Sequence, residues 1–448
     1  MDQAPAPKLV EHDLRAAILG ELHARPFHPL AAPRRLIHLG FMTDAAAAGA
    51  DRARLAAFAA RHALPGPVDG AKQHRLALPE ANLRWEQHSE FTTMTWDFAC
   101  ALPSGDSAAD FPPPLPTAIL ATIRALAAPG PLLVAADLLL LAEEGGPAMT
   151  RIFDPASLAA ASADHGAAVI ATDFRPRPSP LAEAGAVMLL VRDRGMGETR
   201  AGALVQRVLE IETYRTLALL ALPETQRLMP VMARIEAGLA RVTHAMTETA
   251  GGLETDHRLL DELTRLAAAL EAEAAASQFR FTAARAYDEI VAQRLGAIGE
   301  AALDPWPSLS AFLARRLAPA MRTCQMLERR QDALATRLAR GANLLRTRVD
   351  VAIEQQNRDL LRSMNARTAL QLRLQHTVEG LSIAAISYYV LALIGHVLDG
   401  LAARGWLLGL SSVAVQAMAV PPVVLAVALL LRRVRRHASA EAGHTERP

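Results

Sequence analysis

A dense polar cluster near the N-terminus, at 21–27, holds residue types that acid/base chemistry requires. Glu21 supplies a carboxylate, His23 an imidazole whose charge changes near neutral pH, and Arg25 a guanidinium. A spacing of two residues on a helix, however, turns these side chains toward different faces. The sequence also places no partner nucleophile or metal ligand beside them. A cap and salt-bridge role therefore outweighs the catalytic interpretation.

Polar residues also recur at helical spacing in the C-terminal part of the chain. Alternating steps of about four and three residues place them on one narrow helix face. Polar groups are costly in lipid, so this face should meet a partner helix or a water-filled path. The members of this polar stripe are Gln375, Glu379, Ser382, Ile386, Tyr389, Leu393, His396 and Gly400.

Two interpretations of the polar stripe compete. In the first, several copies of the helix line an axial pore, and Asp399 attracts cations at its outer mouth. In the second, Ser382, Ser387 and Tyr389 form hydrogen bonds between helices and no ion passes. The sequence slightly favours the second. The pore-lining candidates of the first are Glu379, Ser382, Tyr389, His396 and Asp399.

Two long uncharged runs, 380–398 and 405–431, predict a membrane hairpin. Each reaches the roughly 20 apolar residues that a helix needs to cross a hydrocarbon layer about 30 Å thick. We therefore predict transmembrane helices at 381–398 and 411–431, joined by a short outward loop. The alternative is a buried helical hairpin of a soluble protein. It is weaker, because soluble core helices seldom run this far without a charge.

Arginines that flank the two runs predict their orientation. Only Arg404 lies in the loop, so the positive-inside rule places both termini in the cytoplasm. The prediction is a multi-pass protein of the bacterial inner membrane with a basic, disordered cytoplasmic tail at 432–448. Pro421-Pro422 in the second run predicts a kink, either a gating hinge or, as we prefer, a tolerated irregularity. The flanking arginines are Arg358, Arg362, Arg367, Arg373, Arg432, Arg433, Arg435 and Arg436.

The composition excludes several function classes. Lys and Arg total 47 against 46 Asp and Glu, so no basic field predicts nucleic-acid binding. Only Lys8 and Lys72 are lysines, which with the abundant alanine favours a GC-rich bacterial gene. Cys100 and Cys324 allow neither a disulfide framework nor a cysteine zinc site. The N-terminal region lacks the apolar segment of a secretory signal.

Sequence motifs of common enzymes are absent as well. The chain has no Walker loop, no dinucleotide-binding glycine motif after a strand and no serine-hydrolase elbow. Its histidines show no metal-ligand spacing. We therefore predict that the protein is not an enzyme and holds no cofactor or metal centre.

Residues up to about 195 predict a mixed α/β cytoplasmic domain, 1–195. Short runs rich in β-branched, aromatic and other apolar residues alternate with helical patterns. We expect strands at 35–42, 74–78, 81–88, 91–101, 131–141, 148–153, 167–173 and 186–192. We expect helices at 10–24, 45–62 and 117–127.

Beyond a hinge at 195–197 the pattern is helical. A helical domain over 202–302 should contain helices at 202–222, 225–249, 253–277 and 280–302. Ser308 then caps a long stalk helix, 308–380, that runs into the membrane. A single helix over 319–398 would be about 120 Å long, too long for one globular core.

Apolar residues recur along the stalk at spacings of mostly three or four. This repeat favours association with neighbouring helices, and the alternative is an isolated helix pair within one chain. The members of this apolar stripe are Leu327, Leu334, Leu338, Leu345, Val349, Ile353, Gln356, Leu360 and Met364.

The predicted layout resembles the CorA magnesium-transporter superfamily. That likeness rests on an α/β domain, a stalk helix entering the membrane, a short loop, a second span and a basic tail. The stretch 377–386 is similar to the membrane entry of that superfamily's stalk. The Gly-Met-Asn triplet expected after the first span is absent, and Leu398-Asp399-Gly400-Leu401 stands there. The resemblance implies a homo-oligomer, pentameric by analogy, around an ion path.

Three stretches, 21–26, 209–215 and 377–389, more closely resemble a bacterial family of predicted membrane-anchored proteins. Members of that family carry a domain of unknown function, so the resemblance implies no established activity. The residues of its first two signatures are Glu21, His23, Arg25, Pro26, Glu210, Glu212, Tyr214 and Arg215.

The leading hypothesis from sequence is therefore a CorA-like homo-oligomer in the lipid bilayer. Its first span would line a path for monovalent or divalent cations, gated by the cytoplasmic domain. The alternative is a membrane-tethered scaffold or sensor without transport activity. An enzyme in the α/β domain ranks third because no catalytic constellation is recognisable.

Overall fold

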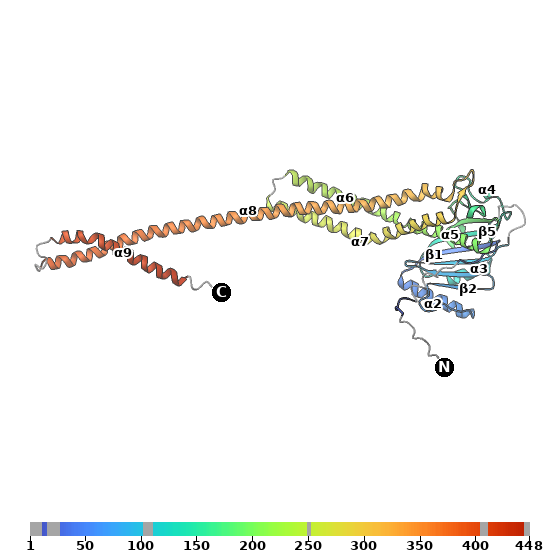
Figure 1. Ribbon diagram of the computed structural model, residues 1–448, viewed down its shortest axis with the longest axis horizontal. Coiled ribbons are helices and arrows are strands. Elements are labelled where there is room, and N and C mark those ends of the chain that lie inside the picture. The colour runs from blue at the N-terminus through green and yellow to red at the C-terminus, as the bar shows by residue number, and fades with distance from the viewer. Residues whose placement is uncertain (1–10, 16–26, 102–110, 249–251, 404–410, 443–448) are drawn as a thin grey trace, which may run out of the picture. The chain divides into compact units, whose positions relative to one another are not determined.

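The computed structural model describes residues 11–15, 27–101, 111–248, 252–403 and 411–442. It contains a mixed α/β domain in its N-terminal part, then a long helix, then a C-terminal pair of apolar helices (Figure 1). The chain divides into two compact units, one of residues 1–249 and 261–342 and the other of residues 250–260 and 343–448. The first unit contains the sheet, and the second contains the apolar helix pair.

Ten strands of the described chain form one sheet, in the order β10-β6-β7-β9-β5-β1-β4-β3-β2, with β8 paired to β9. All pairings are antiparallel except that of β5 with β9. The strands are β1 Arg34–Met42, β2 Gln73–Ala77, β3 Asn82–Gln87, β4 Phe91–Ala99, β5 Leu132–Ala142, β6 Ala159–Ala163, β7 Ala168–Thr172, β8 Pro176–Ser179, β9 Ala182–Asp193 and β10 Ala301–Ala302.

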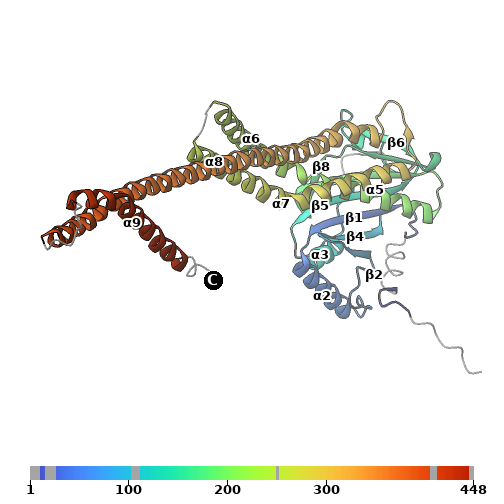
Figure 2. The same ribbon diagram turned by 60° about the vertical axis from the view of Figure 1, so that its left-hand side comes forward.

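One face of strands β1 to β4 is apolar and forms a core with two helices. Residues directly opposite each other on neighbouring strands point to the same side, and Ile37, Trp96, Leu83 and Leu76 form such a row. Helices α2 (Ala45–Arg61) and α3 (Thr117–Leu126) cover this row (Figure 2). Burial of these large side chains stabilises this half of the sheet.

The opposite face of the same strands is polar, because side chains alternate along a strand. Helix α5 (Glu198–Ala218) covers this face, so His38, Thr95 and Asp97 are buried, while Arg75 at the sheet edge stays exposed. The remaining half of the sheet, β5 to β9, packs a second apolar core with α4 (Met149–Ile152) and the segment around Trp306. A short 3-10 turn, Asp164–Gly166, joins β6 to β7.

Three helices of the first unit pack together beside the sheet: α6 (Ala221–Glu248), α7 (Leu253–Ala297) and the start of α8 (Leu309–Ala402). Within this unit, Leu327, Leu334 and Leu338 of α8 are at most 2% exposed. The first part of the apolar stripe is thus covered by the chain's own helices. Ion pairs join each pair of these helices: Arg227–Glu273 at 2.8 Å, Arg330–Glu236 at 2.5 Å and Arg285–Glu328 at 2.8 Å.

Helix α8 begins where the sequence predicts a cap. The Ser308 hydroxyl accepts a hydrogen bond from the Ala311 amide at 3.2 Å. The Glu300 carboxylate accepts two more, from the amides of Leu309 and Ser310. These acceptors satisfy amides that the first helical turn leaves unpaired. The helix then continues for 94 residues with Pro319 inside it.

The second unit contains the rest of α8 and helix α9 (Ser412–Ala442). Both helices are long and apolar enough to cross a membrane, and their most apolar windows are only 11% and 6% buried. A soluble core helix would be mostly buried. Gln416 of α9 donates a hydrogen bond through Nε2 to the Leu391 carbonyl of α8 at 3.1 Å. Pro421 and Pro422 lie inside α9.

Several predicted elements are wrong. Residues 148–153 form α4 and not a strand, and strands β6 and β8 went unpredicted because their residues have low strand propensity. The helices predicted at 253–277 and 280–302 are one helix, α7, which ends at Ala297 before strand β10. Ser277 is compatible with a helix interior because its hydroxyl donates to the Glu273 carbonyl at 2.8 Å.

Two further predictions concern the chain ends. Of the helix predicted at 10–24, only residues 11–15 are described, and they form a turn that reaches helix at Arg15. At the other end α9 extends to Ala442, so 432–442 are helical where the sequence predicts a disordered tail. The apolar helix therefore propagates beyond its hydrophobic part into the basic segment.

Candidate functional site

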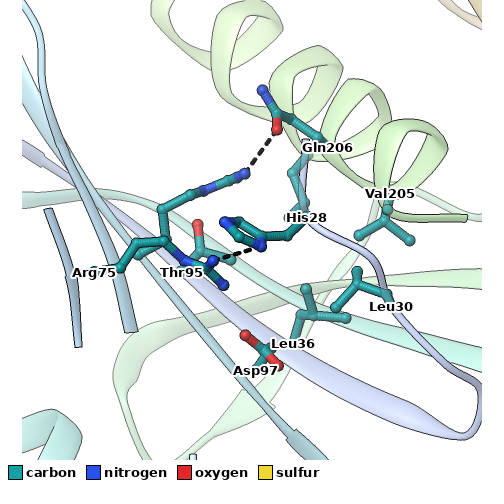
Figure 3. Close-up of a pocket in the computed structure, with 11 residues that line it drawn as sticks. His28, Leu30, Leu36, Arg75, Thr95, Asp97, Val205 and Gln206 are labelled. Atoms are coloured by element: carbon teal, nitrogen blue, oxygen red, sulfur yellow. Dashed lines mark hydrogen bonds between the residues drawn. The ribbon is translucent and has the colours of Figure 1, made fainter. Parts of the chain in front are cut away.

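The candidate site lies between the polar face of the sheet and helix α5. One cross-strand row on this face consists of His38, Thr95, Arg84 and Arg75, from four neighbouring strands. The next row places Asp97 between Leu36 and Asn82. Helix α5 adds Gln206 and Thr213. We call these residues, apart from Leu36, the polar interface; Figure 3 shows several of them around a small cavity.

His38 is the most buried ionisable group of the polar interface, at 4% exposed. Its Nδ1 lies 2.8 Å from the Thr95 hydroxyl and its Nε2 lies 2.9 Å from the Thr213 hydroxyl. The Thr213 hydroxyl already donates to the Leu209 carbonyl, so it must accept from Nε2–H. Thr95 therefore donates to Nδ1. The two threonines thus hold the neutral imidazole with its proton on Nε2.

The neutral form is also the one that burial favours. Desolvation, with a smaller contribution from the Arg84 charge, lowers the pKa of His38 to about 3. A base with so low a pKa cannot take up a proton near neutral pH. His38 therefore positions α5 on the sheet and does not act there as an acid or base.

A cavity of about 30 Å³ adjoins this network, which is room for about two water molecules. His28 and Arg75 are hydrogen-bonded at its wall, and Arg84 donates through Nη1 to Gln206 Oε1 at 2.7 Å (Figure 3). Asp97 accepts from Arg34 at 2.6 Å. Cationic groups outnumber carboxylates here, so the cavity suits water or one small anion.

The segment before β1 is anchored on α5 at Gly202. A Cβ at this position would overlap the backbone carbonyl of His28, so only glycine permits this close approach. The Leu30 amide donates to the Glu198 carbonyl at 3.0 Å, and Arg207 lies over the Phe27 ring at 5.3 Å. Residues 27–30 follow the first family signature directly. The structure thus places residues 27–30 on α5, the helix that carries the second signature.

Signature residues of α5 contact several neighbouring elements. Glu210 pairs with Arg294 of α7 and accepts from Gln206 Nε2 at 3.1 Å. Glu212 holds Arg215 through two hydrogen bonds, at 2.7 and 2.6 Å. The second signature therefore joins α5 to α7 and fixes the Arg215 guanidinium. Glu21, His23, Arg25 and Pro26 lie outside the described residues.

Tyr214, the remaining residue of the second signature, belongs to an aromatic cluster that the sequence did not predict. Its ring lies 5.5 Å from Tyr287 of α7 and 6.1 Å from Phe91 of β4. The Tyr287 hydroxyl donates to Glu90 at 2.6 Å, and Arg280 binds the same carboxylate at 3.2 and 2.8 Å. Burial and the Glu90 charge raise the pKa of Tyr287, so its phenol stays protonated as a donor. These contacts join residues nearly 200 positions apart, which no local pattern reveals.

The predicted pore residues lie in the second unit. Tyr389 is 69% exposed, whereas Ser387 is 3% exposed on the side that meets α9. Gly395 shares that side, and a Cβ there would lie 2.6 Å from the Gln416 amide nitrogen. Successive residues of an α-helix are rotated by about 100° around its axis. By this rotation, the polar stripe lies on the side of α8 opposite to Ser387 and Gly395. Ser382 and Glu379 are half-buried, and His396 and Asp399 border a groove beside α9.

Burial of neutral His38 makes stability depend on pH. The unfolded chain, with a pKa of 6.5, binds more protons than the folded chain between pH 6.5 and about 3. The free energy of unfolding therefore has its full value above pH 6.5 and decreases as the pH drops below 6.5. The loss should reach ~2 kcal/mol between pH 6.5 and 5, at about 1.4 kcal/mol per pH unit.

Urea unfolding of full-length protein at pH 7 and at pH 5 measures this dependence. In His38→Gln, the difference in the free energy of unfolding between pH 7 and pH 5 should shrink by most of the ~2 kcal/mol. The same substitution at the exposed His257 should leave this difference as in the wild type. Equal slopes in the wild type and His38→Gln would contradict the buried neutral imidazole.

Comparison with curated proteins and with solved structures finds no match. Among family models, the one described as "Protein of unknown function (DUF3422)" matches residues 10–438. That range includes the polar interface, the three signature stretches and the two apolar runs. The chain belongs to the DUF3422 family.

Proposed function

We propose that this protein is a membrane-embedded homo-oligomer, similar in layout to the CorA superfamily, in which several copies of α8 surround a path for cations. The bacterial inner membrane is its proposed location, with both termini in the cytoplasm. The arginines on either side of the two apolar helices support that orientation.

The observation that carries the proposal is the change of environment along the apolar stripe. Val349 is 6% exposed, but Ile353, Leu360 and Met364 on the same stripe are 40%, 56% and 62% exposed. A helix with a continuous apolar stripe in water is an association surface. The same repeat of three and four residues runs through the covered and the uncovered part of the stripe. A second copy of α8 carries a matching stripe, so it is the partner that fits the uncovered part.

The polar stripe supports a path for ions in particular. It continues the stalk into the apolar segment. Most of its members lie on the side of α8 opposite the contacts with α9, and Tyr389 is 69% exposed, while His396 borders the groove beside α9. In an oligomer with α9 on the outside, copies of this stripe would meet around the axis. Polar side chains at that depth stabilise water and cations, whereas lipid would penalise them.

A matched pair of tyrosines tests the path. Tyr389 belongs to the polar stripe, and its neighbour Tyr388, equally exposed, borders the groove beside α9. In liposomes holding purified protein, Tyr389→Ala should change cation flux about tenfold, a barrier difference of ~1.4 kcal/mol. Tyr388→Ala should stay near the wild-type flux. Fluorescent indicators for Mg²⁺ and K⁺ inside the liposomes measure both.

Absence of flux for every cation tested, where a known transporter is active, would sink the transport proposal. The alternative is a membrane-tethered scaffold or sensor. One observation favours it: the hydrogen bond from Gln416 to Leu391 holds the apolar pair together within a single chain. A tether predicts no flux and a soluble first unit that keeps its contacts without the apolar helices.

A further inference from the structure

A second cavity of the first unit lies where α5, the β7–β8 segment and the start of α8 meet. It measures about 270 Å³. Three arginines line it, one from each element: Arg215, Arg175 and Arg316. Asp173 is the single carboxylate of the lining, and Arg177 already neutralises it at 3.1 Å. Glu212 and Asp154 pair with Arg215 and Arg175, so Arg316 carries the excess positive charge at the cavity.

Two of these arginines lie over aromatic rings. The Arg215 guanidinium lies 4.7 Å from the Phe174 ring centre, and Arg316 lies 3.9 Å from that of Phe312. The two rings are themselves 5.0 Å apart. These cation–π contacts hold both guanidinium groups beside the rings, and the N–H donors that no other group uses stay available. The four side chains thus present two cations at one cavity.

Arg215 and Arg316 keep N–H groups that donate to no acceptor among the described residues. Glu212 takes Nε and Nη2 of Arg215, and its Nη1 makes no hydrogen bond with the described residues. Arg316 has no ion pair among those residues. Arg175 binds Asp154 at 2.5 Å and remains 61% exposed. At least two guanidinium groups can therefore donate to an anion in the cavity.

Apart from Ser157, the rest of the lining is apolar, and it determines which organic group the ligand can carry beside its anion. Leu219, Leu313 and Leu317 form this wall. A guanidinium group already lies over each of the two rings, so the rings offer no free face to an aromatic ligand. The leucine wall therefore suits a small organic group that is not aromatic. The N–H donors that remain on Arg316 and on Nη1 of Arg215 favour an anion with several acceptor oxygens, such as a phosphate, over a carboxylate. A volume near the lower limit of ligand sites restricts the molecule to a small one.

We propose that this cavity, the arginine–phenylalanine cavity, binds a small phosphate monoester. Its phosphate accepts hydrogen bonds from Arg215 and Arg316, and its organic body packs against the leucines. The ligand would join α5 to the first turns of α8. This inference does not depend on ion transport or on oligomerisation.

Calorimetric titration of the full-length protein with glycerol 3-phosphate and with inorganic phosphate tests the site. The wild type should bind glycerol 3-phosphate at least tenfold more tightly than inorganic phosphate, because only the ester reaches the apolar wall. Equal affinity for the two would overturn the monoester assignment. Absence of binding by either would overturn the site.

Two neighbouring arginines of α8 provide a matched pair. Arg316→Gln should weaken binding of glycerol 3-phosphate at least tenfold. Arg315→Gln changes an exposed arginine outside the cavity lining and should leave the affinity unchanged. Both positions are on the surface, so both variants should fold. An equal loss in the two variants would show that the effect is unspecific charge and would contradict the proposal.

Discussion

Replacing Ile353, Leu360 and Met364 with lysine is expected to convert the oligomer to monomers. These side chains belong to the uncovered part of the apolar stripe. Complete burial of such a side chain contributes about 1.5–3 kcal/mol, and a lysine in its place loses this and adds repulsion between copies. Even ~3 kcal/mol per chain would weaken association about 100-fold. Sedimentation of the protein in detergent measures the mass of the particle.

The matched control carries three lysines on the opposite side of the same helical segment. Gln355, Ala366 and Ala369 are exposed and lie about half a turn away from the stripe. Their replacement adds the same charge to the helix but should leave the oligomer intact. Circular dichroism should show full helicity in both triple variants. A wild-type monomer, or an oligomer that survives the stripe substitutions, would contradict the proposed association.

Gly202→Ala is expected to destabilise the first unit by about 2–3 kcal/mol. The new Cβ would overlap the His28 carbonyl, so segment 27–30 must leave α5. The Leu30 amide then loses its bond to Glu198, worth about 1 kcal/mol. Leu30, 8% exposed, would lose burial worth about 1.5–3 kcal/mol. The better helix propensity of alanine offsets up to about 1 kcal/mol of this loss.

Urea unfolding followed by tryptophan fluorescence measures the change, because Trp85 and Trp96 are fully buried in the same sheet. Gly296→Ala in α7 is the control, since nothing lies within 4 Å of a Cβ there. That variant should be as stable as the wild type or slightly more stable. If Gly202→Ala matched it, the proposed anchoring of the N-terminal segment on α5 would be wrong.

The apolar stripe on α8 shows how much of the structure hydrophobic periodicity can predict. The repeat of three and four predicts a helix with one associating face, and the structure contains that helix. The repeat alone does not say what covers the face. Leu327 to Leu338 are covered by α6 and α7 of the same chain, as the isolated-pair alternative expects, while Ile353 to Met364 remain uncovered. The two cases differ in whether the residue lies beside α6 and α7 or beyond the point where α6 ends, at Glu248, and α7 begins, at Leu253.

The residues of the polar interface were the hardest to anticipate. Phe91 to Ala99 alternates threonine or aspartate with large apolar residues, a pattern typical of a strand with one side in water. The structure instead covers the polar side with α5, so Thr95 and Asp97 are themselves buried. His38 and Thr213 are 175 positions apart in sequence. Their pairing depends on where α5 crosses the sheet.

By itself, the sequence determined the order of the parts: an α/β domain, a set of helices, one very long helix and two apolar runs. These features follow from hydrophobic spacing and segment length, which are properties of neighbouring residues. The tertiary structure decided which faces are covered, the neutral state of His38, and the meeting of Arg215, Arg175 and Arg316 at one cavity. Such juxtapositions join residues distant in the chain, and only packing brings them together.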